Sequence, residues 1–421
     1  MNIPGYKELK ILYHQLGSDA LSRITAELKH RIDSPSSLKW NYSINSAPIF
    51  VNMVSGLTAV LEKIWRRELE IEQRWMQLPG AARVHYLHSL LVNEIRSSNE
   101  IEGIYSTRKE VQEAIEAADS RGSAREVPRP YQEMAKTYML LFGELGTKRV
   151  QFPTTLGELR ELFDSLLGQE ISSEDDLDGE FFRKGPVSIV DGIKEKHRGA
   201  EGEEAINAGV QAVLQSQQDT EHLLVNAFVG HFMLEHVHPF YDGNGRFGRF
   251  LLSLKLTEVL SAPTAISLSS AILQQKSAYY KAFKRAEEKQ NSGELTFFVF
   301  DMAMILLSAM DELLESLVEK SSQLKQLESR MNDLSMEAGN QEAALNDKEL
   351  AILFLLGQVH LFGPRSGLTQ EELCKLLNRS APTVRSVTIK LRDRGLIEEI
   401  KHRPLVFSLT REATDLFGIS D

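Results

Sequence analysis

The chain has 421 residues, 42% of them apolar and 25% charged, and a formal net charge of −11, which fits a globular protein of about two to four domains. This charge excludes a global basic field that would draw the protein to nucleic acid or to a membrane surface. The single cysteine, Cys374, excludes a disulfide framework. No apolar run is long enough to span a membrane, and the first residues lack a signal-peptide pattern. We therefore expect a cytoplasmic protein without membrane contact.

The apolar residues predict a mainly α fold, because most of them recur at the spacing of one helix face. The first 45 residues have a mixed pattern, and we expect them to form a small N-terminal subdomain. Before residue 180, the periodicity predicts helices over Ile49–Gln77, Ala82–Ser97 and residues 111–118. After residue 200, it predicts helices over residues 203–217, residues 219–236 and from Arg246 onward.

One stretch interrupts these helices. Residues 181–192 combine glycine, proline and a short apolar alternation, which predicts a small β-hairpin in an otherwise helical protein.

A long helix is predicted from about Phe297 to Asn340, with a break at residues 337–341. Its apolar residues follow a heptad spacing in which Lys320 is the one polar member: Met310, Leu313, Leu317, Leu324, Leu327, Met331 and Leu334. One interpretation is a coiled coil that pairs two chains into a homodimer. The other is a helix that packs this stripe on its own domain, and the sequence favours neither.

The last part of the chain, residues 346–421, is expected to be a separate winged helix-turn-helix unit. A helix over Ala351–Val359 comes first, and Thr369 caps the next one. Ser380 or Thr383 starts a third helix, which ends at Gly395. Two short strands then flank residues 401–404. Counted from Arg379 to Arg403, this unit has seven basic and three acidic residues, a local basic patch that suits DNA. The alternative is a module for protein docking or dimerisation, and the sequence favours neither.

The strongest chemical pattern is the segment from His238 to Arg249, HPFYDGNGRFGR. Glycines at 243 and 245 permit a turn whose backbone N–H groups form a nest for anions. The positive end of a helix that starts near Arg246 points at the same place. Arg246 and Arg249 lie three residues apart, on one side of that helix, and guanidinium groups bind phosphate oxygens in pairs.

A carboxylate and an imidazole complete this pattern. Bare phosphates would repel Asp242, so its presence predicts Mg²⁺ between carboxylate and phosphate oxygens. His238 titrates near neutrality and can accept a proton from an incoming hydroxyl. Taken singly, these residues would be a core histidine and surface ion pairs. At this spacing they predict attack by an alcohol on a metal-bound phosphate.

The segment resembles the signature of the Fic family, HxFx(D/E)GNGRxxR, at every fixed position. The resemblance implies a Fic-type helical core at residues 46–300, with a small β-hairpin flap, followed by the long helical linker at 301–345. It also implies transfer of AMP from ATP to a protein hydroxyl on Ser, Thr or Tyr, which can belong to the chain itself. By position, His238 is the general base and Asp242 the Mg²⁺ ligand. The implied nucleotide-binding residues are Gly243, Asn244, Gly245, Arg246, Gly248 and Arg249.

A second resemblance lies upstream, in an inhibitory helix near residues 90–103. Ser98-Asn99-Glu100-Ile101-Glu102-Gly103 is similar to the inhibitory pattern of the family, (S/T)xxxE(G/N). It implies that Glu102 pairs with Arg249 and removes the partner of the ATP γ-phosphate. The plain alternative is a helix end capped by Gly103, and both can hold at once.

Two further sets of residues are weaker candidates. The hairpin is similar to the flap of the family, and Val187, Ser188 and Ile189 would dock a target segment as an added strand. The alternative is an ordinary surface hairpin. Tyr279 and Tyr280 are candidate walls of the nucleotide pocket, although aromatic residues at helical spacing are more often part of a core.

These features favour an autoinhibited protein adenylyltransferase. One alternative is a DNA-binding transcriptional regulator whose Fic-like domain only senses nucleotide, although such a sensor has no need of a base at His238. Another is the reverse reaction, removal of AMP from a modified protein, in which Glu102 would orient a water molecule.

Overall fold

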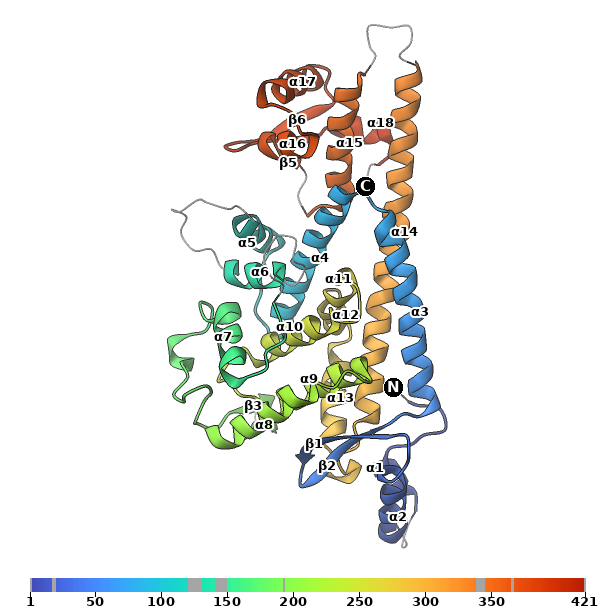
Figure 1. Ribbon diagram of the computed structural model, residues 1–421, viewed down its shortest axis with the longest axis vertical. Coiled ribbons are helices and arrows are strands. Elements are labelled where there is room, and N and C mark those ends of the chain that lie inside the picture. The colour runs from blue at the N-terminus through green and yellow to red at the C-terminus, as the bar shows by residue number, and fades with distance from the viewer. Residues whose placement is uncertain are drawn as a thin grey trace. The chain divides into compact units, whose positions relative to one another are not determined.

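The computed structural model describes residues 2–16, 20–119, 131–140, 150–191, 194–337, 345–364 and 367–419 (Figure 1). The chain divides into two compact units, Met1–Glu68 with Asn93–Asp311 and Leu69–Val92 with Glu312–Asp421. The described residues are mainly helical, with three small antiparallel sheets. This confirms the predicted mainly α fold with a small hairpin. Over the same residues, no helix is both long and apolar enough to cross a membrane. The domain boundaries expected at residues 45, 300 and 345 stay a prediction.

The first unit begins with α1 (Leu9–Gln15) and α2 (Ala20–Ile32), followed by the antiparallel strands β1 (Ser37–Ile44) and β2 (Ala47–Asn52). The helix α3 (Ser55–Gln77) comes next. The prediction of a helix starting at Ile49 is therefore wrong by six residues. The segment from Ile49 to Asn52 pairs with β1, and Phe50 also bridges to Glu294. These two partners favour the strand over the helix that the local periodicity predicts.

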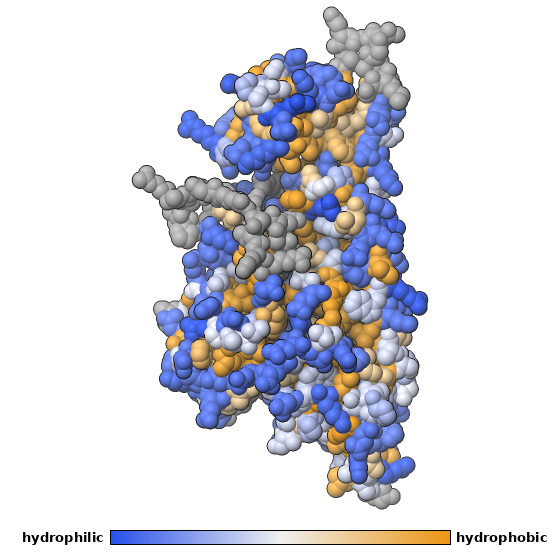
Figure 2. Space-filling view, viewed as in Figure 1, coloured by the Kyte–Doolittle hydropathy of each residue, from blue (hydrophilic) through white to orange (hydrophobic). Residues whose placement is uncertain are grey.

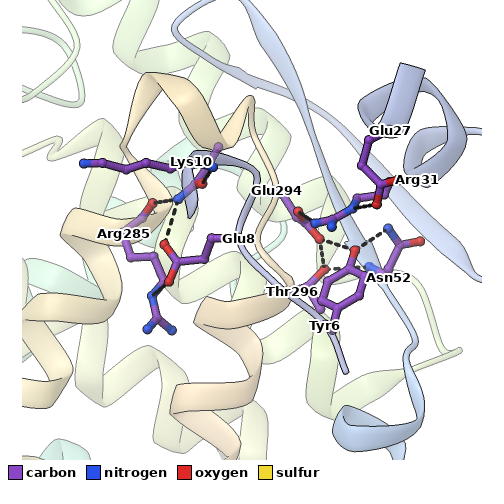
Figure 3. Close-up of polar contacts among 10 residues, drawn as sticks. Tyr6, Glu8, Lys10, Glu27, Arg31, Asn52, Arg285, Glu294 and Thr296 are labelled. Atoms are coloured by element: carbon purple, nitrogen blue, oxygen red, sulfur yellow. Dashed lines mark hydrogen bonds and ion pairs between the residues drawn. The ribbon is translucent and has the colours of Figure 1, made fainter. Parts of the chain in front are cut away.

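A buried polar cluster ties the N-terminal elements to the start of α14 (Thr296–Glu337) (Figure 3). The Nη1 of Arg31 lies 2.8 Å from the Oε2 of Glu294. The hydroxyl of Tyr6 donates to Glu294, and the Arg31 guanidinium lies 4.2 Å from the centre of the Tyr6 ring. Thr296 donates to Glu294 at 3.0 Å and accepts from the backbone N–H of Asn52 at 2.9 Å. Burial of a charge requires such a set of partners, and here each charge has them.

Apart from a β-hairpin between α7 and α8, the rest of the first unit is helical up to α14. Its helices are the part of α4 (Gly80–Ile101) from Asn93 onward, α5 (Arg108–Asp119), α6 (Gln132–Met139), α7 (Leu156–Leu167), α8 (Glu203–Ser216), α9 (Leu223–Val237), α10 (Asn244–Leu256), α11 (Ala262–Ala265), α12 (Leu268–Gln274) and α13 (Lys276–Ala286). Short 3-10 turns lie at Ser173–Asp175 and Lys289–Asn291. Figure 1 shows α9 and α10 in succession beside α7 and α8.

Aromatic stacking fixes the loop between α9 and α10. The ring of Phe240 in this loop stacks on Phe163 of α7 with centroids 3.6 Å apart. Phe247 and Phe182 meet Phe240 edge-on at 5.5 and 5.6 Å. All four side chains are almost fully buried. The loop that carries the predicted site is therefore anchored by its own core residue.

The predicted hairpin is displaced along the chain. Its strands are β3 (Ser188–Asp191) and β4 (Lys194–Arg198), so the prediction of residues 181–192 is wrong for 181–187. Phe182 and Arg183 are fully buried instead, which explains the apolar character of that part. The second strand, KEKHR, lacks any apolar alternation that the sequence could have revealed. Gly192 lies outside the described residues.

In the second unit, the apolar stripe of α14 is covered by the same chain. Leu313, Leu317, Leu324, Leu327 and Met331 are 0–6% exposed. Leu327 contacts Gly357 of α15 (Asp347–Phe362), where an added Cβ would lie 2.4 Å from its side chain. Lys320 of α14 donates to the carbonyl of Leu361, which also belongs to α15. The coiled-coil interpretation is therefore wrong for these residues, and a homodimer through another surface stays a prediction. Of the expected break, residues 338–341 lie outside the described residues.

The C-terminal elements follow the predicted order. After α15 come β5 (Gly367–Thr369), α16 (Gln370–Leu377), α17 (Ala381–Asp393), β6 (Ile397–His402), β7 (Leu405–Leu409) and α18 (Arg411–Phe417). The three strands form one antiparallel sheet in the order β5-β7-β6. Thr369 caps α16 as predicted, accepting from the N–H of Glu372 at 3.1 Å while the Glu372 carboxylate accepts from the N–H of Thr369 at 2.7 Å. Of the two predicted starts of α17, Ser380 is the N-cap.

Candidate functional site

The predicted phosphate loop lies between two left-handed residues. His238 caps α9 with a φ of 53°, and Gly243 precedes α10 with a φ of 80°. The side chain of Asn244 closes the loop, because it accepts from the N–H of Phe240 at 2.9 Å and donates to the carbonyl of Phe240 at 2.8 Å. These bonds orient the first backbone N–H groups of α10, the groups that bind anions at a helix start.

Close approach explains two of the glycines in α10. A Cβ added at Gly245 would lie 2.2 Å from the Oε1 of Glu102, and one added at Gly248 would lie 2.0 Å from the Oε1 of Glu235. A side chain at either position would displace a carboxylate. Gly243 has a positive φ and faces Leu167, so the turn itself requires glycine there.

Each of the two arginines is buried and held by a carboxylate. Arg246 is 3% exposed; its Nη2 lies 3.1 Å from Asp242, and its Nη1 lies 3.4 Å from Glu170. Arg249 is 1% exposed, and its Nη1 lies 2.8 Å from the Oε1 of Glu102. The predicted contact between Glu102 and Arg249 is therefore present.

Ser98 completes the surroundings of Arg249. The Nε of Arg249 donates to the Ser98 hydroxyl at 3.1 Å, and its Nη2 donates to the Ser98 carbonyl at 2.8 Å. Glu102 lies directly after α4, where Gly103 has a φ of 79°. The N–H groups of Gly103 and Ile104 donate to the carbonyls of Glu100 and Asn99, the pattern of a Schellman cap. The helix end expected at Gly103 and the contact to Arg249 thus occur together.

Burial and charge act on several groups around Arg249. Burial is the largest single influence on the pKa of Arg249 and lowers it, but Glu102, Tyr279 and Glu235 together raise the pKa above its ordinary value. Burial raises the pKa of Glu94, on the same face of α4 as Ser98, to about 7, and Arg249 opposes this shift. Burial, with Arg249 as the next cause, lowers the pKa of His231 to about 3. His231 is therefore a neutral core residue.

The imidazole of His238 stands where α9 ends. The residue is 8% exposed, and its Nδ1 lies 3.3 Å from the carbonyl oxygen of Glu235. A hydrogen on Nδ1 can donate to that carbonyl, which leaves Nε2 as the basic nitrogen. This tautomer is the one required of a general base.

The remaining predicted residues differ in their surroundings. Tyr279 is 2% exposed and its hydroxyl lies 2.8 Å from the Nε2 of His231, so it packs in the core. Tyr280 is 39% exposed, and burial followed by the charge of Glu102 raises its pKa to about 12. A role of these two residues in nucleotide binding stays a prediction. In the hairpin, Ser188 pairs with Arg198 and Ile189 with His197, while the carbonyl of Val187 accepts from Gly199.

Three contacts of the site were not predicted from the sequence. Arg183 donates to the carbonyl of His238 at 2.8 Å, and Tyr241 accepts from the N–H of Gly185 at 2.8 Å. Glu170 approaches Arg246, and burial raises the pKa of its carboxyl to about 7. Nothing in the spacing of these residues links them to the loop, because each contact joins distant segments of chain.

A magnesium ion would have one carboxylate here. The described residues contain no group of three or more His, Cys, Asp or Glu side chains placed to hold a metal. The Asp242 side chain is 52% exposed and pairs with Arg246. Because Mg²⁺ in nucleotide sites is bound through one or two carboxylates and substrate phosphates, a single accessible carboxylate fits it.

Comparison with known proteins finds similarity over the part of the chain that contains this loop. Residues 153–256 match the Fic/DOC family. The protein adenylyltransferase Fic of Drosophila mojavensis is 33% identical over 147 residues, which are 34% of this chain and 26% of that protein. The same protein of Drosophila willistoni is 30% identical over 125 residues, 30% of this chain and 22% of that protein. The chain thus spans about a quarter of the length of these relatives.

The fold has a counterpart among solved structures. The crystal structure of a Fic family protein from Desulfovibrio desulfuricans superposes with a TM-score of 0.50 at 18% sequence identity. The match covers 86% of this chain and 97% of the other. At this identity the likeness concerns the fold alone.

Proposed function

We propose that residues 153–256, which match the Fic/DOC family, form an adenylyltransferase domain that moves AMP from ATP to a hydroxyl group of a protein. The observation that carries the proposal is the loop from His238 to Asn244. It places a histidine at the end of α9, a carboxylate at Asp242 and the N-terminus of α10 within seven residues. The name of the Drosophila relatives, protein adenylyltransferase, supports the same reaction.

The chemistry follows from the donors and the base. The first N–H groups of α10 hold phosphate oxygens, and Arg246 and Arg249 hold the distal phosphates. The Nε2 of His238 takes the proton of the target hydroxyl as its oxygen bonds to the α-phosphorus. The bond from the α-phosphorus to the bridging oxygen breaks, and pyrophosphate leaves with both electrons of that bond. Base catalysis of this kind contributes about 10²–10⁴-fold to the rate.

Asp242 would hold Mg²⁺ beside the phosphates. When bound, the ion neutralises phosphate charge. The carboxylate itself restrains Arg246, whose Nη2 lies 3.1 Å away, so loss of Asp242 would also release that guanidinium.

In the same proposal, Glu102 is inhibitory. Its carboxylate oxygen Oε1 lies 2.8 Å from the Nη1 of Arg249. The same oxygen lies so close to Gly245 that a Cβ added there would clash with it. It therefore stands where a γ-phosphate would need a guanidinium partner, and like charge would repel that phosphate. A displacement of the α-phosphate by about 1 Å can lower the rate about 100-fold.

The hairpin β3–β4 is the proposed docking place of the target. It is a two-stranded sheet, so each strand has an outer edge among the described residues. Backbone pairing of a target segment with such an edge would present its Ser, Thr or Tyr hydroxyl without strict side-chain specificity.

A second candidate function concerns the C-terminal module, which we propose is a winged helix-turn-helix that binds DNA. Arg385 and Lys390 are exposed on α17, and Lys401 and Arg403 lie at the tip of the β6–β7 hairpin. The acidic Glu399 is engaged by Arg392 at 2.7 Å, which reduces its repulsion of phosphate. In Figure 2 the surface over α16 and α17 is largely hydrophilic.

The experiment for the adenylyltransferase uses Glu102→Gly with ATP labelled in the α-phosphate or, separately, in the γ-phosphate. We expect label on protein from the α-phosphate alone, together with release of pyrophosphate. Label from the γ-phosphate would show a kinase instead. If no label transfers but added AMP-modified protein loses AMP in the wild-type chain, the reaction is the reverse one, with Glu102 orienting water. If the chain binds ATP and does neither, it is a nucleotide sensor.

A further inference from the structure

Arg183 is a fully buried arginine whose hydrogen-bond acceptors are backbone carbonyls. It is 0% exposed. Its Nη1 donates to Gly185 at 2.6 Å and its Nε to His238 at 2.8 Å. Its Nη2 donates to Ala200 at 2.9 Å and to Val237 at 3.4 Å. A buried guanidinium needs several acceptors to offset its lost hydration, and this one obtains them from the main chain.

These carbonyls belong to three segments that the hairpin and the site share. Gly185 precedes β3, Ala200 follows β4, and Val237 and His238 end α9. One side chain thus joins both ends of the hairpin to the residue that carries the imidazole. Direct backbone bonds reinforce the junction: Ala200 donates to Val237 at 3.0 Å, and Arg183 donates to Pro239 at 3.3 Å.

Two neighbours fit this junction closely. Tyr241, in the loop of the site, accepts from the N–H of Gly185 at 2.8 Å and donates to Asp178 at 3.0 Å. At Gly199, an added Cβ would lie 2.4 Å from the Nη2 of Arg183 and 2.9 Å from the Cβ of His238. Gly199, at the end of the hairpin, therefore lies against Arg183 and His238, and a side chain at this position would clash with both.

From this arrangement we propose that Arg183 is a positioning residue for the transfer reaction, because it fixes the distance between the docking hairpin and the base His238. The proposal rests on the proposed function. A target segment paired with the hairpin brings its hydroxyl to a place set by residues 185 and 200. Arg183 bonds to the carbonyls of residues 185 and 200 and to the carbonyl of His238. The target hydroxyl is therefore placed close to the Nε2 of His238.

The geometry requires a guanidinium and not only a positive charge. The three guanidinium nitrogen atoms of Arg183 lie in one plane, and each donates to a different segment. A lysine ammonium is a compact group that can reach only part of this set. Arg183→Lys therefore keeps the buried charge but loosens the hairpin relative to His238, and a displacement of about 1 Å can cost about 100-fold in rate.

The test uses the full chain with Glu102→Gly as parent. Arg183→Lys, Tyr241→Phe and the control Arg31→Lys are each added to it. Arg31 is a matched control because it is 4% exposed and bound in the N-terminal cluster, among Glu27, Glu294 and Tyr6. For every variant, ATP titration calorimetry gives the affinity and the fraction of chains that bind ATP. Self-transfer of AMP from α-labelled ATP at saturation gives the rate.

We expect Arg183→Lys to lower the transfer rate about 100-fold with ATP affinity and binding stoichiometry close to those of the parent. Tyr241→Phe, which loses the hydrogen bonds to Gly185 and Asp178, should lower the transfer rate about ten-fold. Arg31→Lys should keep the rate per ATP-binding chain. A parental rate in Arg183→Lys overturns the proposal, and so does a loss of rate that matches a loss of ATP-binding chains, since Arg183 would then act only through folding. A parent that binds ATP but transfers no AMP contradicts the proposed function itself, before any variant is compared.

Discussion

The Oε1 of Glu102 lies 2.8 Å from the Nη1 of Arg249, and this ion pair joins the end of α4 to α10. The two partners differ in burial, since the side chain of Arg249 is 2% exposed and that of Glu102 is 32% exposed. Arg249 is also held by Ser98 through two further nitrogens. The guanidinium is therefore fixed, and the carboxylate is the partner that can move away when a phosphate takes its place.

The first prediction concerns nucleotide affinity. Glu102→Gln removes the charge that competes for Arg249, so ATP should bind about ten-fold more tightly, the effect of one charge-assisted hydrogen bond. AMP, which lacks the distal phosphates, should gain little. Calorimetric titration with both nucleotides checks this, with Glu100→Gln as the control on the same helix. An equal gain for AMP would place the effect of Glu102 elsewhere than at Arg249.

The second prediction concerns Asp242. Asp242→Ala should abolish AMP transfer, because it removes the single carboxylate proposed to hold Mg²⁺ and releases Arg246. Excess Mg²⁺ should not restore the activity. Asp164→Ala is the matched control, since Asp164 forms a similar pair four residues from Arg160 at 2.8 Å. Transfer assays over a range of Mg²⁺ concentrations decide, and recovery at high Mg²⁺ would argue against Asp242 as the ligand.

The third prediction follows from Glu94. This carboxyl is 0% exposed and accepts from the N–H of Ser269 at 3.0 Å and from its hydroxyl at 2.5 Å. Burial raises its pKa from 4.5 to about 7. Between these values the folded chain holds a proton that the unfolded chain has lost. The contribution of protonated Glu94 to the free energy of unfolding is therefore complete below pH 4.5 and is lost as the pH rises to about 7.

The size of this effect is measurable. At 1.36 kcal/mol per unit, the shift corresponds to about 3 kcal/mol of unfolding free energy. Glu94→Gln is neutral at every pH, so its unfolding free energy should fall by about 2.5 kcal/mol less than that of the wild type between pH 5 and pH 8. Urea unfolding at the two pH values gives the comparison. Identical pH dependence in both proteins would mean that Glu94 is charged when folded at neutral pH.

The fourth prediction concerns DNA. Binding of the chain to a duplex of random sequence should weaken steeply as the salt concentration rises. The reason is that bound Lys and Arg side chains displace counterions from the DNA phosphates. Arg385→Ala should reduce the slope of log affinity against log salt by about 1. Arg394→Ala is the control, since Arg394 pairs with Glu349 at 3.5 Å. Fluorescence anisotropy at several salt concentrations checks both. Absence of binding at low salt would favour protein docking as the role of the module.

Local signals allowed much of this structure to be predicted. Thr369, Gly103 and the loop around Gly243 are positions where a cap or a positive φ demands a particular residue, so their identity is visible in the sequence. The Glu102–Arg249 contact was predicted only through resemblance to a family. Its residues are 147 positions apart, and no periodicity connects them.

Features that depend on distant partners were missed. Ile49 to Asn52 form a strand because β1 and Glu294 lie beside them, and the carbonyl contacts of Arg183 leave no trace in spacing. The heptad stripe of α14 is the same for a coiled coil and for a helix buried in its own chain, so only the packing of Leu327 against Gly357 distinguishes the two.

The most direct measurement of the central claim compares AMP transfer by three proteins: the wild type, Glu102→Gly, and Glu102→Gly combined with His238→Ala. The account predicts that Glu102→Gly transfers AMP about 10- to 100-fold faster than the wild type. The double variant should bind ATP as tightly as Glu102→Gly but transfer AMP at least about 100-fold more slowly. Equal transfer with and without the imidazole would contradict the account, and so would a Glu102→Gly variant no faster than the wild type.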